Sequence, residues 1–233
     1  MTYNLANRLG QEQGERIAAQ IADSSADFVA VQEANDGDWL LDRLLGQYEL
    51  TAEPDAGVAL VYDASRWELR DEGSIALGDN DDGWGPRVAV WGLFADADDR
   101  GLYVYSTHWC VTIRTPDDDC DQARQLDYAD QILDTLDDAL PSVIAGDLNV
   151  FDGFEAGAVI GHLEDSGLVD VFRSVNPDLD ATTFAGNTWA PAGRLDYIFT
   201  TSPVDVLAAR IERDTGLTGD ASDHFAVTAT VSF

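Results

Sequence analysis

The chain has 233 residues, which suits a single domain and is ample for a buried core. Its 45% hydrophobic and 24% charged residues are typical of a globular protein, and no apolar run is long enough to span a bilayer. The net charge of −31 comes from 44 acidic and 13 basic residues, and every basic residue is arginine. This balance excludes a basic surface that would bind nucleic acid at low ionic strength.

The acidic residues are spread along the whole chain, with dense runs at 79–82, 96–99 and 117–119. A cation-buffering or calcium-binding surface is one interpretation. Adaptation to a very salty medium is the other, because salt screens the self-repulsion of such a surface. The even spread favours adaptation to salt. In that medium the repulsion of phosphates is also screened, so nucleic acid remains a candidate partner.

The first half of the chain predicts strand–helix units followed by more strands. Residues 2–5 read as a strand directly after Met1, with no signal peptide evident, although an earlier trimming stays open. Ile17 and Ile21 at helical spacing predict a helix over 11–25, and a second helix is expected over 38–45. Strands are predicted over 27–33, 57–62, 67–77, 87–94 and 102–108, the last four as a β-meander.

The second half begins with an amphipathic helix expected over 121–140 and a buried strand over 141–145. A short helix over 154–167, an extended piece over 169–172 and a long loop over 176–193 follow. Strands are predicted over 194–200, 204–213 and 225–233. We see no internal repeat and no linker, so we expect one domain over 1–233 in which two sheets pack together with helices outside.

Cys110 and Cys120 are the two cysteines, and they flank one polar loop. Their spacing favours a small disulfide loop, which would make the protein secreted; two free thiols would be typical of a cytoplasmic enzyme.

Polar side chains gather at predicted strand ends, most clearly in Gly146-Asp147-Leu148-Asn149. Asp147 and Asn149 fall on one face at the rim of the strand, and Gly146 permits a tight turn or the close approach of a ligand. The tetrapeptide alone would equally form an ordinary turn. Its significance depends on the other strand-end groups, which are Asn4, Glu33, His108, Asp196, Asp223 and His224.

In this order, these groups resemble the endonuclease/exonuclease/phosphatase superfamily, which includes deoxyribonuclease I. Six segments from residue 2 to residue 224 carry the resemblance: Thr2-Tyr3-Asn4, Gln32-Glu33, Thr107-His108, Gly146-Asp147-Leu148-Asn149, Arg194-Leu195-Asp196-Tyr197-Ile198-Phe199 and Ser222-Asp223-His224. The resemblance implies an α+β fold, a four-layer α/β/β/α sandwich, with the site at one edge of the paired sheets. It also implies hydrolysis of phosphate esters with a divalent metal.

The resemblance assigns the metal to Glu33 and Asp223, with Asn4 as a further ligand or as a contact to Glu33 or phosphate. Oxygen ligands suit Mg²⁺ or Mn²⁺, with Ca²⁺ as a further candidate. The sequence lacks the Cys/His cluster that would indicate zinc.

The catalytic roles implied by the resemblance fall on five residues. His224 would bind a phosphate oxygen or carry a proton, with Asp196 fixing its tautomer. Asp147 would orient or deprotonate the attacking water, and Asn149 would also bind the substrate by donating to a phosphate oxygen. His108 would act as an acid or a phosphate ligand.

Two arginines, one histidine and three tryptophans are further candidates for the site or its surroundings. Arg87 is a candidate substrate ligand or a surface strand residue, whereas Arg194 is expected to support the site. His162 lies outside any motif and is interpreted as structural. Trp84, Trp109 and Trp189 would stack on a substrate or, more commonly for loop tryptophans, pack locally.

The sequence therefore predicts a monomeric, nuclease-like phosphodiesterase adapted to high salt. The alternatives are a phosphatase, a sphingomyelinase-like lipid phosphodiesterase, and a non-catalytic acidic binding protein on the same scaffold. An inositol phosphatase is disfavoured, because Ala145 stands where that branch has Trp. Its Pro-x-Trp-Cys-Asp-Arg signature is also missing, since the chain reads Pro191-Ala192-Gly193-Arg194-Leu195-Asp196.

Overall fold

The computed structural model describes residues 1–6, 11–34, 48–55, 57–78, 86–112, 120–152, 156–186, 192–213 and 221–233. The helix expected over 38–45 lies outside these residues, as do Trp84, Trp189 and most of the loops over 79–86 and 110–120.

Two six-stranded mixed sheets form the centre of the molecule. The first has the order β11-β12-β1-β2-β4-β3. Its strands are β1 (Thr2–Asn4), β2 (Phe28–Gln32), β3 (Tyr48–Asp55), β4 (Val58–Asp63), β11 (Asp205–Ile211) and β12 (Val227–Ser232). β1 and β2 are parallel and end at the same edge of this sheet.

The second sheet has the order β5-β6-β7-β8-β10-β9. Its strands are β5 (Glu68–Ala76), β6 (Val88–Ala95), β7 (Gly101–His108), β8 (Ser142–Asp147), β9 (Val169–Asp170) and β10 (Asp196–Thr200). β7 and β8 are parallel, and β10 runs antiparallel beside β8, so β10 begins where β7 and β8 end.

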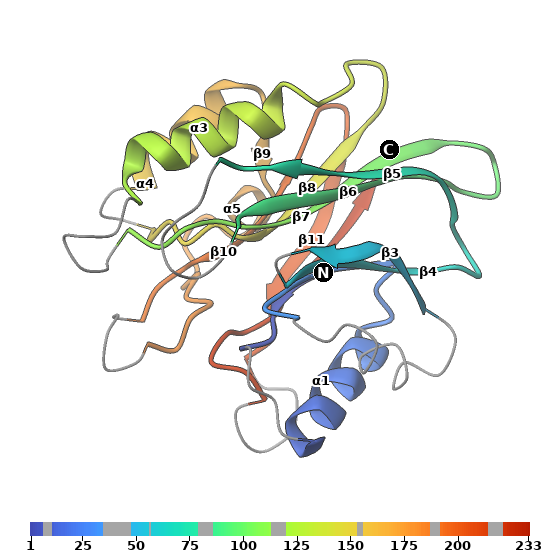
Figure 1. Cartoon of the computed structure of the whole chain (residues 1–233), viewed down its shortest axis with the longest axis horizontal. Coiled ribbons are helices and arrows are strands. Elements are labelled where there is room, and N and C mark those ends of the chain that lie inside the picture. The colour runs from blue at the N-terminus through green and yellow to red at the C-terminus, as the bar shows by residue number, and fades with distance from the viewer. Residues whose placement is uncertain are drawn as a thin grey trace.

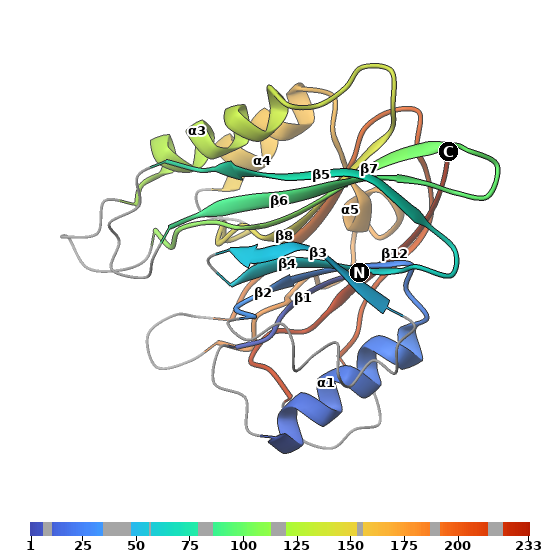
Figure 2. The ribbon, with the colours of Figure 1, turned by 45° about the vertical axis from the view of Figure 1, so that its right-hand side comes forward.

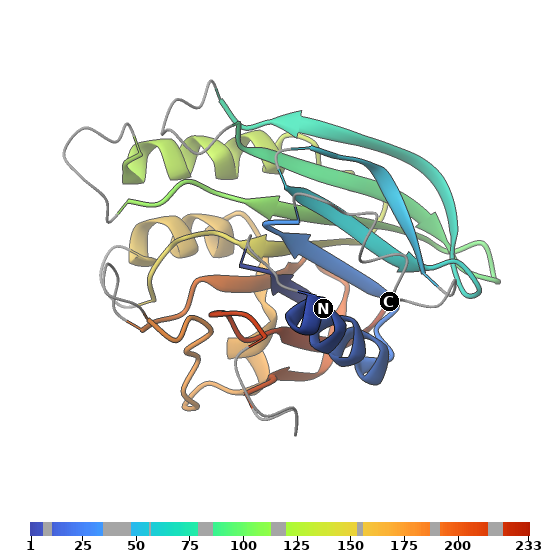
Figure 3. The same ribbon diagram turned by 60° about the horizontal axis from the view of Figure 1, so that its bottom comes forward.

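Helices cover the outer faces of both sheets, as Figures 1 and 2 show. α1 (Gln11–Ser24) buries Ile17 and Ile21 against the first sheet. α3 (Gln122–Leu133) and α4 (Ala156–Asp165) lie side by side on the second sheet (Figure 3). The predicted four-layer α/β/β/α sandwich is confirmed. Among the described residues, no helix is long and apolar enough to cross a membrane.

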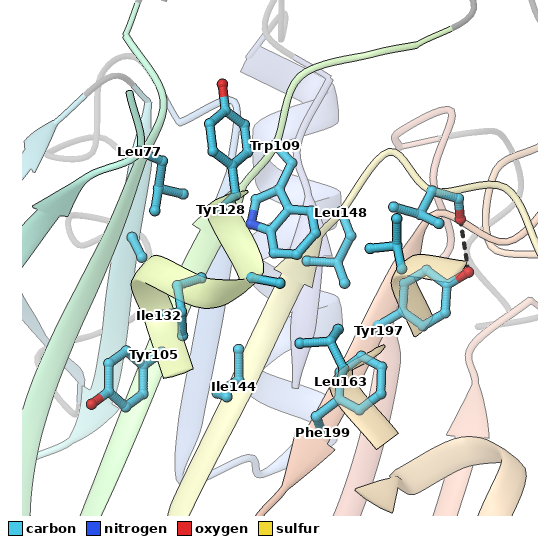
Figure 4. Packing of buried hydrophobic residues seen from close by; sticks show 14 of the residues in the cluster. Leu77, Tyr105, Trp109, Tyr128, Ile132, Ile144, Leu148, Leu163, Tyr197 and Phe199 are labelled. Atoms are coloured by element: carbon cyan, nitrogen blue, oxygen red, sulfur yellow. Dashed lines mark hydrogen bonds between the residues drawn. The ribbon is translucent and has the colours of Figure 1, made fainter. Parts of the chain in front are cut away.

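Apolar side chains line the space between the sheets and pack under the helices. Ala30 and Val227 of the first sheet pack with Ala145 and Ile198 of the second. α5 (Val171–Val175) adds Phe172 to the same cluster at the edge of the sandwich. Under α3, a second cluster joins aromatic side chains to the strands of the second sheet (Figure 4).

Local sequence patterns misplaced some elements. The predicted meander is wrong in its first strand, because β4 pairs with β2 and β3 in the first sheet while β5 to β7 belong to the second. β3 was not predicted. The extended piece over 169–172 is only partly extended, because Asp170 ends β9 and caps α5 by accepting from the backbone N–H of Arg173. The alternation of apolar and polar residues predicts which face of a strand is buried. It does not predict the sheet to which the strand belongs.

Candidate active site

The predicted site residues meet at one end of the space between the two sheets. In the second sheet, His108, Asp147 and Asp196 are direct neighbours on adjacent strands. In the first sheet, Asn4 is the last residue of β1, and Glu33 directly follows β2. This arrangement follows from the parallel pairs, because the carboxyl ends of parallel strands reach the same edge of a sheet.

Asn4 connects the two sheets. Its side-chain nitrogen donates to Asp147 Oδ2 at 2.9 Å and to Glu33 Oε1 at 3.2 Å, and its Oδ1 accepts from the backbone N–H of Ala6 at 2.9 Å. Behind it, Gln32 Nε2 donates to Ser106 Oγ at 3.2 Å, again across the sheets. Hydrogen bonds therefore fix the relative position of the two groups of strand ends.

Asp196 and His224 form a buried pair. His224 Nδ1 lies 2.8 Å from Asp196 Oδ2. Burial alone would lower the pKa of His224, but the negative charges of Asp196, Asp147 and Asp223 outweigh it and raise the pKa to about 10. The imidazole is therefore a cation whose Nε2 proton is directed away from Asp196.

Two residues outside the predicted set hold this pair. Thr183 Oγ1 accepts from the backbone N–H groups of Leu195 and Asp196, at 2.9 and 3.0 Å. Phe184 packs its ring 5.0 Å from that of His224. Both lie in the segment interpreted as a long loop, and no sequence motif singled them out.

Asp147 lies between the two histidines. Its Oδ2 is 3.7 Å from His108 Nε2 and 3.9 Å from His224 Nε2, while its Oδ1 accepts from the backbone N–H of Asn149 at 2.9 Å. Burial and the neighbouring Asp196 carboxylate raise the pKa of Asp147 above its ordinary value. A carboxylate with a raised pKa is a stronger base, which suits it to accept a proton from water.

His108 differs from His224 in charge. Burial lowers the pKa of His108 well below its ordinary value, and the positive charges of Arg87 and His224 add to the effect. Arg87, the residue before β6, is itself buried. The site thus pairs a neutral imidazole with a charged one, a separation typical of acid–base chemistry.

The carboxylates of Glu33 and Asp223 interact electrostatically. Burial raises the pKa of Glu33, and the charge of Asp223 raises it further, although Asn4, His224 and Arg87 oppose this. Asp223 is exposed. A divalent cation would relieve the repulsion between these oxygen ligands, so the residues fit a hard metal ion.

Three possible ligand atoms, one each from Asp147, Asp196 and His224, lie within 4.8 Å of one another. The hydrogen bond between Asp196 and His224 and the positive charge of the imidazole argue against a metal there. In this trio, the short contact between Asp196 and His224 is instead suited to hold a proton.

Two site residues have left-handed backbones, with φ of 54° at Glu33 and 51° at Asn149. Asn tolerates this conformation, whereas Glu adopts it at a cost of about 1 kcal/mol. Asn149 is further fixed by its side-chain nitrogen, which donates to the Trp109 carbonyl at 2.9 Å.

Several residues weighed from the sequence lie outside the site. Arg194 forms a buried bidentate ion pair with Asp170 and stacks over Tyr197, so it supports β10. His162 pairs with Asp130 between α4 and α3, at 2.6 Å. Trp109 is fully buried in the core rather than available to a ligand.

Cys110 and Cys120 form a disulfide, as their spacing favoured. The structure explains glycine at position 146 by something other than the predicted turn or ligand contact. A Cβ at this position would lie 2.1 Å from the Thr107 carbonyl oxygen, so glycine allows β8 to approach β7.

The sequence model described as the endonuclease/exonuclease/phosphatase family matches residues 1–224. The chain belongs to this family. Members of the endonuclease/exonuclease/phosphatase family are phosphoester hydrolases, and the chain is a phosphoester hydrolase. The family generally uses divalent metals. No curated protein matches the chain's sequence.

Solved structures of other family members share the fold at low sequence identity. TDP2 from D. rerio, complexed with single-strand DNA product, gives a TM-score of 0.80 at 18% identity, covering 100% of this chain and 97% of that one. A mannosyl-6-phosphatase from Bacteroides thetaiotaomicron gives 0.74 at 18%, covering 100% and 98%. The human Nocturnin catalytic domain with bound sulfate gives 0.76 at 20%, covering 99% and 92%.

Proposed function

We propose that this family member is a divalent-metal-dependent phosphodiesterase, nuclease-like and adapted to high salt. The observation that carries the proposal is the cross-sheet contact in which Asn4 donates to both Glu33 and Asp147. It joins a carboxylate suited to a metal with a carboxylate suited to proton transfer. A non-catalytic binding protein would have no use for this arrangement.

Glu33 and Asp223 would hold Mg²⁺ or Mn²⁺, and Ca²⁺ would also suit their oxygen ligands. An ion held there would supply charge neutralisation at the phosphate. Asn4 holds the Glu33 and Asp147 carboxylates. This role agrees better with its contacts than the metal ligation or phosphate binding suggested by the sequence, because its nitrogen faces the carboxylates and its oxygen accepts from Ala6.

Asp147 accepts the proton of the attacking water, favoured by its raised pKa. His224 donates its Nε2 proton to a phosphate oxygen and so stabilises the negative charge that develops there. Asp196 fixes the tautomer of His224 through Nδ1.

Asn149 uses one amide proton on the Trp109 carbonyl and offers the second to a phosphate oxygen. Neutral His108 is a second hydrogen-bond partner for the phosphate or the leaving oxygen. Arg87 contributes a buried positive charge that favours an anionic substrate, as its effect on the pKa of His108 supports.

The acidic composition supports activity in high salt, where a phosphate substrate is not repelled. The Cys110–Cys120 disulfide supports an exported enzyme. We further propose that residues 1–233 act as one domain and as a monomer.

A phosphatase is the second candidate. The likeness to a mannosyl-6-phosphatase favours it as much as the likeness to TDP2 with its single-strand DNA product favours a nuclease. A sphingomyelinase-like lipid phosphodiesterase is a further alternative.

A substrate panel in molar salt with Mg²⁺ or Mn²⁺ tests the proposal. Bis(p-nitrophenyl) phosphate, p-nitrophenyl phosphate, single-stranded DNA, RNA and sphingomyelin vesicles separate the alternatives. We expect cleavage of diesters over monoesters, and its loss in Glu33→Ala and His224→Ala with the fold retained. Full activity in either variant would refute the assigned site.

A further inference from the structure

Gln125 is a buried amide on the otherwise apolar face of α3. Its side-chain nitrogen donates to the carbonyl oxygens of Cys110 at 3.1 Å, Asn149 at 3.3 Å and Leu148 at 3.5 Å. A buried amide that contacts three carbonyls in this way holds the chain segments together, with its two hydrogens shared among the three acceptors.

The two segments held by Gln125 are those that carry site atoms. They follow β7 and β8, and they also contact each other. The backbone N–H of Trp109 donates to the Asp147 carbonyl at 2.9 Å, and Asn149 Nδ2 donates to the Trp109 carbonyl at 2.9 Å. Gln125 therefore lies directly behind the backbone on which Asp147 and Asn149 are carried.

The position of Gln125 is itself fixed. Asp121 caps α3 by accepting from the backbone N–H of Arg124 at 2.8 Å, and the adjacent Cys120 is bonded to Cys110. One turn after Gln125, Tyr128 packs edge-on against Trp109, with ring centroids 6.0 Å apart (Figure 4). The start of α3 is thus attached to the first segment by a covalent bond, a ring contact and the Gln125 amide.

We propose that Gln125 is a positioning residue for the phosphodiesterase reaction, an inference that rests on the proposed function. Its amide sets the distance between the segment 109–110 and the segment 148–149. In this way it holds the Asn149 side chain and the Asp147 carboxylate in register with the reacting phosphate.

The matched variants are Gln125→Met, which keeps the length of the side chain but removes the donor, and Gln131→Met on the same helix. Gln131 donates to the exposed Asp127 carboxylate and touches neither segment. We expect kcat on bis(p-nitrophenyl) phosphate to fall on the order of 10- to 100-fold in Gln125→Met, because small displacements of catalytic groups have effects of this size. The Mg²⁺ affinity and KM of Gln125→Met should change less than about twofold. The activity of Gln131→Met should likewise change less than about twofold.

A double-mutant cycle with Asn149→Ala separates positioning from general weakening. If Gln125 acts through Asn149, Gln125→Met lowers kcat much less in the Asn149→Ala background than in the wild type. Equal losses in both backgrounds would overturn the proposal. Should Gln125→Met not fold, Gln125→Asn retains the amide one methylene further back, and the same loss of kcat and the same coupling are expected.

Hydrogen exchange gives a measurement that does not depend on activity. The amides of Trp109 and Asn149 should exchange faster in the Gln125 variant than in the Gln131 variant, because both donate to Asp147 within the supported segment. A wild-type chain that cleaves no phosphodiester would refute the proposed function alone. Unchanged exchange at both amides would refute the role of Gln125 whatever the activity.

Discussion

Nδ1 of His224 lies 2.8 Å from Oδ2 of Asp196, and both side chains are buried. The carboxylate keeps the proton on Nδ1 and leaves Nε2 facing the site, 3.9 Å from Asp147. Orientation and charge of the imidazole therefore both depend on Asp196.

Asp196→Asn should lower kcat by roughly 10³- to 10⁴-fold, as expected where a carboxylate fixes the tautomer of a catalytic histidine. Steady-state kinetics checks this, with circular dichroism to show that the fold is kept. Asp130→Asn is the matched control, because Asp130 contacts His162 in a surface pair far from the reaction. A loss of less than tenfold in Asp196→Asn would contradict the role of the pair.

Glu33→Gln should weaken Mn²⁺ binding by about tenfold or more, since it removes the negative charge of a proposed ligand. Isothermal titration calorimetry measures the affinity without any substrate. Glu12→Gln serves as control, because Glu12 pairs with Arg16 on the surface of α1. Equal metal affinity in the two variants would place the ion elsewhere.

Gly146→Ala should destabilise the protein by roughly 3 kcal/mol, because the new Cβ would collide with the Thr107 backbone. Gly161→Ala is a control of opposite sign. Nothing lies within 4 Å of a Cβ at that position of α4, and alanine in a helix is favoured over glycine by about 1 kcal/mol. Urea unfolding measures both free energies. If Gly146→Ala folds with wild-type stability, the close approach of β7 and β8 is not obligatory.

His108 should make stability depend on pH. Its pKa in the folded protein lies well below 6.5, the ordinary value that the unfolded chain retains. Its contribution is therefore complete above that value and is lost as the pH falls through it, because only the unfolded state then takes up the proton. Between neutral pH and about pH 5.5, the free energy of unfolding of His108→Gln should therefore fall by less than that of the wild type, which urea unfolding at the two pH values measures.

Low salt should destabilise the protein, because 44 acidic residues then repel one another without screening. We expect the Tm in dilute buffer to lie roughly 10 °C below that in molar KCl, which corresponds to about 3 kcal/mol. Differential scanning calorimetry measures this, with sucrose in place of KCl to separate screening from general solute effects. An unchanged Tm would rule out adaptation to salt.

The sequence predicted two packed sheets with helices outside, because buried strands and amphipathic helices are recognised from their apolar patterns. The family resemblance placed the strand-end residues Asn4, Glu33, His108, Asp147 and Asp196 at one edge, and the structure brings them together.

Contacts between distant segments could not be predicted in the same way. The sequence around Thr183 does not indicate that its hydroxyl oxygen accepts hydrogen bonds from the backbone N–H groups of Leu195 and Asp196. Gln125 was not singled out in the sequence, because its three carbonyl partners lie 15 to 24 residues away. The helix also ends at Leu133, before the predicted residue 140, because Asp134 begins a series of turns that leads into β8.

The contact from Asn4 to Asp147 crosses between the sheets, so neither sheet contains a complete site by itself. The rate of turnover therefore depends on how the two sheets are positioned relative to each other. Heating, lower salt or a core substitution could each displace one sheet relative to the other by a fraction of a residue. Such a displacement should abolish activity while the strands themselves persist. Loss of activity would then precede loss of the β-sheet signal in circular dichroism.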